Sequence, residues 1–404
     1  MRIAILASSY LPVLDGVAVS VHERAARLAA AGHVVLLLAP RPGREIPPGL
    51  VPPDVVHVPL SSAPFGGVPG DRNPLRAAQR EIERALSAFR PDVIHVDEPD
   101  RLALGLLRVP AGAFARRHGI PVIAFFHTPF VDYVVGERRP RWLSALGWRA
   151  VAALFNRYDA TLVPGAAMLR RLEGAGLANG VCGPFNGADT SLFTPALRRA
   201  GYWREEWGLP GLDARFVLLI VGRLTPDKGW AQWAEALPRL GRLLGDGLAV
   251  VVAGEGELRP RVEAMLARDL SHGRLLGAVP RARMPALLAN GDACATLSRH
   301  ENASLAVLEA QASALPVVAP RAGGLPDQIA DGTTGLLFAP SDPEGIVTAV
   351  ARLVREEALR ARLREGLMAR RAAIGWDAAF EAWLGAVEAI AARTGEWRDR
   401  AARE

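Results

Sequence analysis

The chain has 404 residues, half of them hydrophobic, and its two cysteines, Cys182 and Cys294, lie far apart without metal-ligand spacing. This length exceeds what one hydrophobic core usually supports, so two domains are expected, and the cysteine pattern argues against a disulfide framework or a zinc site. No apolar run approaches the roughly 18 residues of a membrane span, and the first apolar run is too short for a signal peptide. These features predict a cytoplasmic protein.

The net charge of +6 is unevenly distributed along the chain. Residues 1–200 hold 23 Arg against 16 acidic residues, whereas residues 201–404 hold 25 basic against 26 acidic residues. No aromatic-and-basic nucleic-acid motif accompanies the basic half, so a phosphate-bearing ligand or an anionic membrane is favoured over nucleic acid as the partner.

Short apolar runs bounded by turn residues alternate with longer amphipathic stretches, which is typical of βαβ units and parallel sheets. The predicted strands are RIAILA, HVVLLLA, VVHVPL, DVIHV, PVIAFF and ATLVPG in the first half, and FVLLIVG, LAVVVAG, RLLGAV, DACATLS, LPVVAP and TGLLFAP in the second. We therefore predict an α/β fold with Rossmann-like domains at 1–195 and 196–375 and a helical tail at 376–404 that packs back on the first domain.

The stretch 186–213 lacks strand character and contains Pro195 and Pro210, so we interpret it as the connection between the domains. Two Rossmann-like domains that face each other form a cleft at the carboxyl ends of their strands. Ligands bind in such clefts, so the turns that follow the strands are the first places to search for chemistry.

Asp15 and Gly16 follow the first predicted strand and directly precede a helical pattern. A glycine at such a turn lets backbone N–H groups approach a phosphate at the positive end of a helix. The alternative is an ordinary structural turn.

The corresponding turn of the second domain, VGRLTPDKGW at 221–230, contains Arg223 and Lys228, the only lysine among 48 basic residues. A compact ammonium ion suits a curved anion on which a planar guanidinium would be misaligned. The alternative is that a single lysine stands here by chance. The turn is not a P-loop, because Gly222 is too close to Lys228 and Gly229 replaces the following Ser or Thr.

Glu301 and Glu309 are separated by seven residues in SRHENASLAVLEAQASALPVVA. If a helix begins near Ala303 or Ser304, its first N–H groups can bind a phosphate or sugar oxygen, and the two carboxylates can accept hydroxyl protons. The alternative for Glu301 is an ordinary helix cap.

The order and spacing of these segments resemble the retaining glycosyltransferases of family 4, which have the GT-B fold of two Rossmann-like domains. The resemblance covers nearly the whole chain, and its motifs are the DGV loop at 15–17, NGADTSLFTP at 186–195, GRLTPDKG at 222–229, GEGELRPRVE at 254–263, the two glutamates and PVVAPRAGGLPDQIADGTTGLLF at 316–338. It implies transfer of a hexose from a nucleoside-diphosphate sugar to a hydroxyl acceptor with retention of the anomeric configuration.

The resemblance also implies roles for individual residues. Arg223 and Lys228 would neutralise the donor diphosphate, Glu309 would hold the ribose hydroxyls, and Glu301 would bind hydroxyls of the transferred sugar. The other implied donor contacts are Gly16 to the diphosphate, Gly277 to Val279 to the base, and the backbone of Asn302, Ala303, Ser304 and Leu305 to sugar and phosphate. Ser304 departs from the glycine that relatives more often have.

FFHTPFVDY, at 125–133, resembles the His-Thr-x-Phe segment of family members that glycosylate lipids. The resemblance places His127 beside the transferred sugar; the alternative is a structural histidine at a strand end. The segment 125–149, with Trp142, Trp148 and several arginines, predicts peripheral binding to an anionic membrane at its inner face. The alternative is a solvated face with core tryptophans.

The chain contains no D-x-D sequence, so we predict that no metal and no cofactor is needed and that Lys228 and Arg223 stabilise the leaving diphosphate instead. Two other functions are considered. The protein could be a nucleotide-sugar-binding sensor without catalysis, or a sugar phosphorylase in which Lys228 forms a Schiff base with pyridoxal phosphate.

Overall fold

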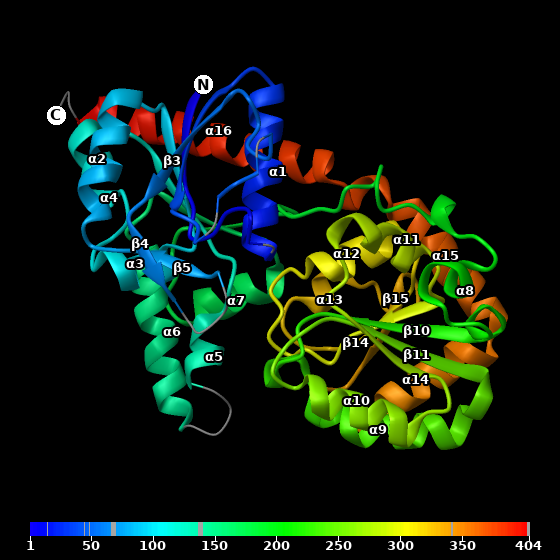
Figure 1. The fold of residues 1–404 in the computed structure, drawn as a ribbon. Helices are drawn as coiled ribbons and strands as arrows, with labels where there is room; N and C mark the ends of the chain where they lie inside the picture. The colour runs from blue at the N-terminus through cyan, green and yellow to red at the C-terminus, as the bar shows by residue number, and fades with distance from the viewer. Residues whose placement is uncertain are drawn as a thin grey trace. The chain divides into compact units, whose positions relative to one another are not determined.

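The computed structural model describes residues 1–13, 15–43, 45–47, 49–65, 70–135, 140–340 and 342–401 (Figure 1). The chain divides into two compact units: unit 1 is Met1–Asn186 with Phe380–Glu404, and unit 2 is Gly187–Ala379. Each unit contains a parallel sheet with helices on both faces (Figure 1). The prediction of an α/β protein with two Rossmann-like domains and a carboxyl-terminal helix is therefore confirmed.

The sheet of unit 1 has seven parallel strands in the order β3-β2-β1-β6-β7-β8-β9. Its strands are β1 Arg2–Leu6, β2 Val34–Pro40, β3 Val55–Leu60, β6 Val93–Asp97, β7 Val122–Phe125, β8 Ala160–Val163 and β9 Gly180–Cys182. A short antiparallel pair, β4 Ser62–Pro64 and β5 Arg72–Pro74, lies outside this sheet. The six predicted strands are present, whereas β9 and the β4-β5 pair were not predicted.

Helices cover both faces of this sheet and bury its apolar strands. The helices are α1 Gly16–Ala30, α2 Ala78–Phe89, α3 Pro99–Leu106, α4 Gly112–His118, α5 Phe130–Val135, α6 Arg141–Phe155, α7 Ala166–Gly174 and the distal part of α16 Trp376–Ala401. Residues of α2, α3, α4, α6 and α7 pack on one face. The other face packs against α1 and against Trp383 and Val387 of α16.

The sheet of unit 2 has six parallel strands in the order β12-β11-β10-β13-β14-β15. The strands are β10 Phe216–Val221, β11 Leu248–Ala253, β12 Gly273–Gly277, β13 Ala293–Ala295, β14 Val317–Pro320 and β15 Gly335–Phe338, and all six correspond to predicted runs. β11 is buried along its whole length. This explains a continuous apolar sequence without alternation, because helices cover both faces of the sheet.

The helices of unit 2 are α8 Tyr202–Trp207, α9 Trp230–Leu244, α10 Arg259–Asp269, α11 Met284–Ala289, α12 Leu305–Ala312, α13 Leu325–Gln328, α14 Pro343–Arg355 and α15 Glu357–Arg370. Residues of α9, α10 and α14 pack on one face of the sheet, and those of α8, α11 and α12 pack on the other (Figure 1).

The stretch 186–213, interpreted from sequence as a connection, is largely built into unit 2. Phe193 and Trp203 are almost completely buried in its core, and the indole Nε1 of Trp203 donates to the Asn290 carbonyl at 3.2 Å. The aromatic residues that interrupt this polar stretch therefore form part of the core of the second domain.

In the part of the chain that the structure describes, no helix combines the length and the apolar character required to cross a bilayer.

Candidate functional site

Backbone hydrogen bonds join the loops at the carboxyl ends of β10, β11 and β12. The Gly254 N–H donates to the Gly277 carbonyl at 2.8 Å, and the Leu224 N–H donates to the Glu255 carbonyl at 2.8 Å. A Cβ added at Gly254 would lie 1.8 Å from the Gly222 oxygen, so a side chain there would force the loops apart. The glycines of GRLT and GEGE thus allow these loops to pack closely against one another and to support the turn that carries Lys228.

A single 3-10 turn, Pro226–Lys228, separates β10 from α9 and presents Lys228. Gly229 follows with φ of 77°, in the left-handed region that favours glycine. A Cβ at this position would also lie 2.5 Å from the backbone oxygen of Leu297. Gly229 is therefore required both by the backbone conformation and by its contact with the segment after β13.

This turn places Lys228 against Glu301, which lies 73 residues further along the chain. The Lys228 Nζ donates to the Glu301 Oε1 at 2.6 Å, and the two side chains are 19% and 18% exposed. Asp227 lies between two cations, with its Oδ2 3.8 Å from Lys228 Nζ and 3.6 Å from Arg223 Nη2. Arg223 is 54% exposed, so this cluster offers cationic groups at the surface of unit 2.

The loop that carries Glu301 is supported by the predicted glycine turn. The Gly324 N–H donates to the Glu301 carbonyl at 2.7 Å. A Cβ at Gly323 would lie 2.3 Å from that same carbonyl, and a Cβ at Gly324 would lie 1.7 Å from the Asn302 oxygen. The two glycines permit this close approach and thereby position Glu301.

Helix α12 begins at Leu305, with Ser304 as its N-cap residue, close to the predicted start. The Ser304 N–H donates to the Gln328 Oε1 at 2.9 Å, and its carbonyl accepts from the Gln328 Nε2 at 3.1 Å. The Asn302 side chain is buried. Gln328, which the sequence did not single out, therefore fixes the backbone where ligand contacts were predicted.

Glu309 lies on α12 and is only 5% exposed. Its Oε1 accepts a hydrogen bond from Arg281 Nη1 and forms an ion pair with it. The Arg281 guanidinium lies over the Phe193 ring, 5.1 Å from its centroid. Arg281 was missed from sequence because nothing distinguishes it among 47 arginines.

Gly277 ends β12 with φ of 75°. A Cβ there would lie 2.8 Å from Glu255 Oε1 and 3.1 Å from Arg259 Nη1, which form an ion pair. Val279, two residues later, packs partly buried against the core. The backbone of Gly277 therefore lies against the charged pair Glu255–Arg259, at the position where the resemblance implies contact with the nucleobase of the donor.

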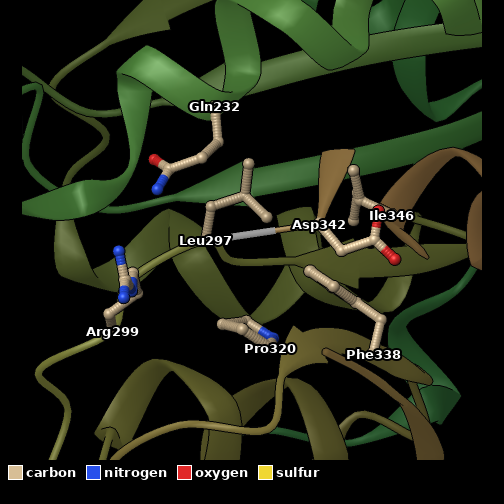
Figure 2. A pocket seen from close by; sticks show the side chains of 7 residues that line it. All are labelled: Gln232, Leu297, Arg299, Pro320, Phe338, Asp342 and Ile346. Carbon is tan, nitrogen blue, oxygen red and sulfur yellow. The ribbon is translucent and has the colours of Figure 1, made fainter. Parts of the chain in front are cut away.

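A pocket lies at the carboxyl ends of β13, β14 and β15, near the loop of Glu301 (Figure 2). Figure 2 shows its walls, which are Gln232, Leu297, Arg299, Pro320, Phe338, Asp342 and Ile346. Leu297 and Arg299 precede Glu301 by four and two residues. The pocket is mainly apolar, with Arg299 and Gln232 on one side and Asp342 on the other.

In unit 1, Gly16 is the first residue of α1 and Asp15 is its N-cap residue. The Asp15 Oδ1 accepts from the Ala18 N–H at 2.7 Å, and its Oδ2 accepts from the Ser9 hydroxyl at 2.7 Å. The carboxylate already supplies negative charge at this helix start, which is the ordinary role of an N-cap aspartate.

His127 follows β7 and is bonded to Asp97, the last residue of β6. The distance from His127 Nε2 to Asp97 Oδ1 is 2.6 Å, and the His127 ring stacks on Phe125 with centroids 4.2 Å apart. Asp97 is completely buried and also contacts Arg24 Nη1 and His95 Nε2, each at 3.2 Å.

The charges around Asp97 determine which groups are ionised. Burial disfavours the charged forms and lowers the pKa of both His95 and Arg24. Burial also opposes ionisation of Asp97, but the nearby His95 and Arg24 and the histidine hydrogen bonds outweigh it and hold the pKa of Asp97 well below its usual value. Asp97 is therefore a carboxylate.

A second carboxyl cluster lies beside this network. Glu98 has φ of 48°, an unusual value for a residue with a side chain, and its carboxylate accepts hydrogen bonds from Ser8 and Thr128. Burial, and then the charge of Glu98, raise the pKa of Asp100 to about 8.

The structure brings together Arg223, Lys228 and Glu301 at one edge of unit 2 and pairs Glu309 with Arg281. Gly16 and His127 belong to unit 1. Among the residues that the structure describes, no group of three or more His, Cys, Asp or Glu side chains has an arrangement that could hold a metal ion.

Two family models match the chain. Residues 14–191 match the model described as Glycosyltransferase Family 4, and residues 204–367 match the model described as Glycosyl transferases group 1. The chain is 31% identical to the GDP-mannose-dependent alpha-mannosyltransferase of Mycolicibacterium smegmatis, over 97% of this chain and 98% of that protein.

The chain is also 31% identical to a GDP-mannose-dependent alpha-(1-6)-phosphatidylinositol dimannoside mannosyltransferase of Mycobacterium tuberculosis, over 99% of this chain and 100% of that protein. A sucrose-phosphate synthase structure from Thermosynechococcus elongatus superposes with a TM-score of 0.73 at 20% identity and full coverage of both chains. The structure of Anabaena HepE with UDP and glucose superposes with the same TM-score at 17% identity, over 96% of this chain and 100% of HepE.

Fold and sequence together define a glycosyltransferase of the GT-B type that uses a nucleotide sugar. The chain belongs to glycosyltransferase family 4. Family membership favours an enzyme over the sensor considered from sequence.

Proposed function

We propose that the protein is a retaining mannosyltransferase that transfers mannose from GDP-mannose to a hydroxyl group of a lipid-linked acceptor. The names of the two mannosyltransferase relatives suggest the donor, and the second also suggests the acceptor class. The observation that carries the proposal is the Lys228–Glu301 pair beside Arg223, at the carboxyl edge of the sheet of unit 2.

In this proposal, contacts with the donor replace some of the contacts that the charged side chains of unit 2 make with one another. Lys228 and Arg223 bind the diphosphate, and Glu301 accepts hydrogen bonds from hydroxyls of the mannose. Because an ammonium group has three N–H donors, Lys228 is able to contact a phosphate oxygen while it remains close to Glu301. The Glu309 carboxylate accepts hydrogen bonds from the ribose hydroxyls, and Arg281 holds this carboxylate in place.

The reaction breaks the bond between the anomeric carbon and the diphosphate, whose negative charge grows as the bond lengthens. Fixed cations that meet this charge stabilise the transition state more than the ground state. We propose that the acceptor hydroxyl attacks from the face that the diphosphate leaves, so that a phosphate oxygen takes its proton and the configuration is retained.

The proposed enzyme needs no divalent metal, because Lys228 and Arg223 supply the positive charge. Activity is therefore expected to persist in excess EDTA. Loss of activity in EDTA with recovery on addition of Mg²⁺ or Mn²⁺ would contradict this part of the proposal.

We propose that unit 1 binds an anionic membrane through α6. Trp142 and Leu146 lie four residues apart, on one face of this helix, and are 67% and 57% exposed. Helix α3 packs against α6, and both Leu104 of α3 and its C-cap residue Leu107 are exposed. Exposed apolar side chains on a basic domain favour binding at the interface of anionic lipids. Trp148, by contrast, is buried and donates to Asp132 at 3.2 Å.

A donor screen tests the proposed function most economically. Purified protein is incubated with GDP-mannose, GDP-glucose, UDP-glucose, UDP-galactose and ADP-glucose, and release of the nucleotide is measured with and without a lipid extract. We expect the fastest release from GDP-mannose and a further increase with lipid. Preference for a UDP or ADP sugar would overturn the proposed donor.

The membrane contact is tested by co-sedimentation with vesicles that contain phosphatidylinositol or phosphatidylglycerol, at low and high salt. A Trp142→Ala/Leu146→Ala variant is the test, and Leu243→Ala on exposed unit 2 surface is the matched control. We expect binding of the wild type and the control at low salt and loss in the double variant. Absence of wild-type binding at low salt would remove this proposal.

A further inference from the structure

Three arginines of unit 2 gather around one aspartate at the amino ends of the sheet strands. Asp292 directly precedes β13, and its N–H donates to the Val217 carbonyl of β10 at 2.8 Å. Its Oδ2 accepts a hydrogen bond from the Val217 N–H at 2.9 Å. These two bonds fix the carboxylate at this edge of the sheet and leave its Oδ1 for side-chain partners.

Arginines from two distant segments of the chain share that oxygen. Arg198 follows the 3-10 turn Pro195–Leu197, and its Nη2 donates to Asp292 Oδ1 at 2.7 Å. Its Nη1 donates to the Gly291 carbonyl at 2.6 Å. Arg364 of α15 reaches the same Oδ1 with its Nη2 at 3.4 Å, which is longer than the roughly 2.7 to 3.2 Å of a typical N–H···O bond. This long contact is the one hydrogen bond that the described residues offer the Arg364 side chain.

Arg360 is the third cation, and it lies one turn before Arg364 on the same face of α15. Its Nη1 donates to two carbonyls in the last turn of α14, at 2.6 Å and 3.0 Å. Its guanidinium carbon lies 5.9 Å from the ring centroid of Phe216, the first residue of β10. These contacts hold Arg360 beside the strand that anchors Asp292.

The positive charge of this cluster exceeds its negative charge. Among the described residues, Asp292 is the one carboxylate that forms an ion pair with any of the three arginines. The end of α14 supplies part of a negative charge to Arg360, so roughly 1.5 elementary charges are not compensated. Burial lowers the pKa of Arg364, the charge of Arg198 lowers it further, and Asp292 raises it. The arginines therefore repel one another where water only partly screens them, and an added anion relieves this repulsion.

The cluster is open to solvent and lies at the edge of the sheet opposite to Lys228. The side chains of Arg198 and Arg364 are 47% and 40% exposed. Strand β10, Phe216–Val221, has one end beside this cluster and the other end before the turn of Lys228. A strand of this length spans about 20 Å. A ligand of the arginine cluster is therefore separate from a donor at the carboxyl ends of the strands.

We propose that Arg198, Arg360 and Arg364 form a second anion site, which binds a phosphate group. Guanidinium groups bind phosphate oxygens with pairs of N–H donors. Each guanidinium has five N–H groups, and most of them make no hydrogen bond within the cluster. A phosphate ester carries roughly 1.5 to 2 negative charges at pH 7, which matches the uncompensated positive charge. The site does not depend on the proposed reaction.

The first test is the thermal unfolding midpoint of the full chain, measured while inorganic phosphate replaces chloride at constant ionic strength. A ligand that binds only the folded state raises this midpoint. Phosphate also stabilises proteins through exclusion from their surface, so the comparison between variants carries the result. We expect a saturable rise in the wild type and in the control Arg362→Gln, which alters an exposed arginine of the same helix.

In Arg364→Gln we expect the Kd for phosphate to rise by at least about tenfold, on the scale of one charge-assisted contact. Arg360→Gln is expected to weaken binding in the same way and serves as the second variant if Arg364→Gln does not fold. A Kd that is unchanged in the folded variants would contradict the proposal.

Lys228→Ala separates this site from the donor cluster. We expect phosphate to bind Lys228→Ala as it binds the wild type, because the two clusters lie at opposite edges of the sheet. Binding that is lost in Lys228→Ala and kept in Arg364→Gln would place the anion at the donor cluster and overturn the proposal.

A dissolved phosphate ester and a lipid headgroup both carry the group that the site binds. Glycerol 3-phosphate in the unfolding assay tests the first source. Co-sedimentation with phosphatidylcholine vesicles, with and without phosphatidic acid, tests the second, in the Trp142→Ala/Leu146→Ala background so that α6 does not contribute. Loss of either signal on Arg364→Gln substitution identifies the source. A wild-type site that responds to inorganic phosphate, glycerol 3-phosphate and phosphatidic acid in none of these assays would overturn the proposal.

Discussion

The two units hold their charged side chains in different ways. In unit 2, Lys228 and Glu301 form a pair in which each side chain is still about one-fifth exposed, and Arg223 is more than half exposed. In unit 1, Arg24, His95 and Asp97 are buried completely or nearly so. A ligand can replace a partner in the first cluster at little cost, whereas the second cluster can change only if the core opens.

This contrast indicates that the two charge clusters have different functions. Charges that pair with each other at a surface are available to an incoming diphosphate. In the absence of the diphosphate, water screens these charges. Charges enclosed in the core are too costly to separate, so they fix the geometry of a neighbour. We therefore expect substitutions in unit 2 to act on donor binding and turnover, and those in the buried unit 1 clusters to act on geometry and stability.

The largest effect in unit 2 is expected for Glu301→Gln. Its proposed partner is the transferred sugar, so kcat should fall about 100-fold while the Kd for GDP changes little. Glu309→Gln should do the opposite and weaken GDP binding, because its proposed partner is the ribose. Kinetics and calorimetry separate the two, and equal effects of both substitutions on both quantities would show that the assignment is wrong.

Lys228 is expected to give the next largest effect. Lys228→Ala removes a charge-assisted contact worth about 1.5 to 3 kcal/mol, which corresponds to roughly 10- to 150-fold in kcat/KM. Lys228→Arg keeps the charge but replaces a compact ammonium with a planar fork, and we expect a loss of at least about tenfold. Arg242→Lys, on the exposed surface of α9, is the control; wild-type kinetics in Lys228→Arg would mean that the single lysine is accidental.

Arg281→Ala is expected to have a smaller effect on the donor. It removes the partner of Glu309, whose carboxylate then loses its fixed orientation, and we expect the Kd for GDP to rise roughly three- to tenfold with kcat nearly unchanged. Arg283→Ala, two residues further along the same loop, is the control. A loss confined to kcat would contradict the proposed role of Arg281.

Asp100 gives a prediction about stability rather than activity. The pKa of Asp100 in the folded protein, about 8, is above that of an aspartate in the unfolded chain. The contribution of this group to the free energy of unfolding is therefore complete below about pH 4 and is lost as the pH rises to about 8. The slope for one group is at most about 1.4 kcal/mol per pH unit. Urea unfolding at several pH values should show Asp100→Asn gaining stability relative to the wild type between pH 5 and 8. A constant difference would contradict the raised pKa.

Six of the seven strands in the sheet of unit 1 and all six in the sheet of unit 2 could be predicted, because each is a short apolar run between turn residues. The paired glutamates, the two glycine turns and Lys228 could be placed at strand ends and helix starts for the same reason. The edge strand β9 Gly180–Cys182 has only three residues and was missed. Sequence could not show that Lys228 and Glu301 are paired, since the contact joins turns 73 residues apart in the chain.

The residues that were missed share one property: their roles depend on tertiary contacts rather than on local pattern. Arg281 stands among 47 arginines, and Gln328 is significant only because its amide spans the backbone of Ser304. Asp97 ends a strand, which is a hint of function, but nothing local indicates that Arg24 and His127 converge on it.

The central claim is that Lys228 meets the diphosphate of the donor, and the sequence itself provides the means to test it. Because Lys228 is the only lysine, protein labelled with ¹³C and ¹⁵N in lysine side chains gives a single ammonium signal that needs no assignment. We predict that this signal shifts when GDP is added, with the Kd that calorimetry gives, and that GMP shifts it less. An unchanged signal at saturating GDP would contradict the account.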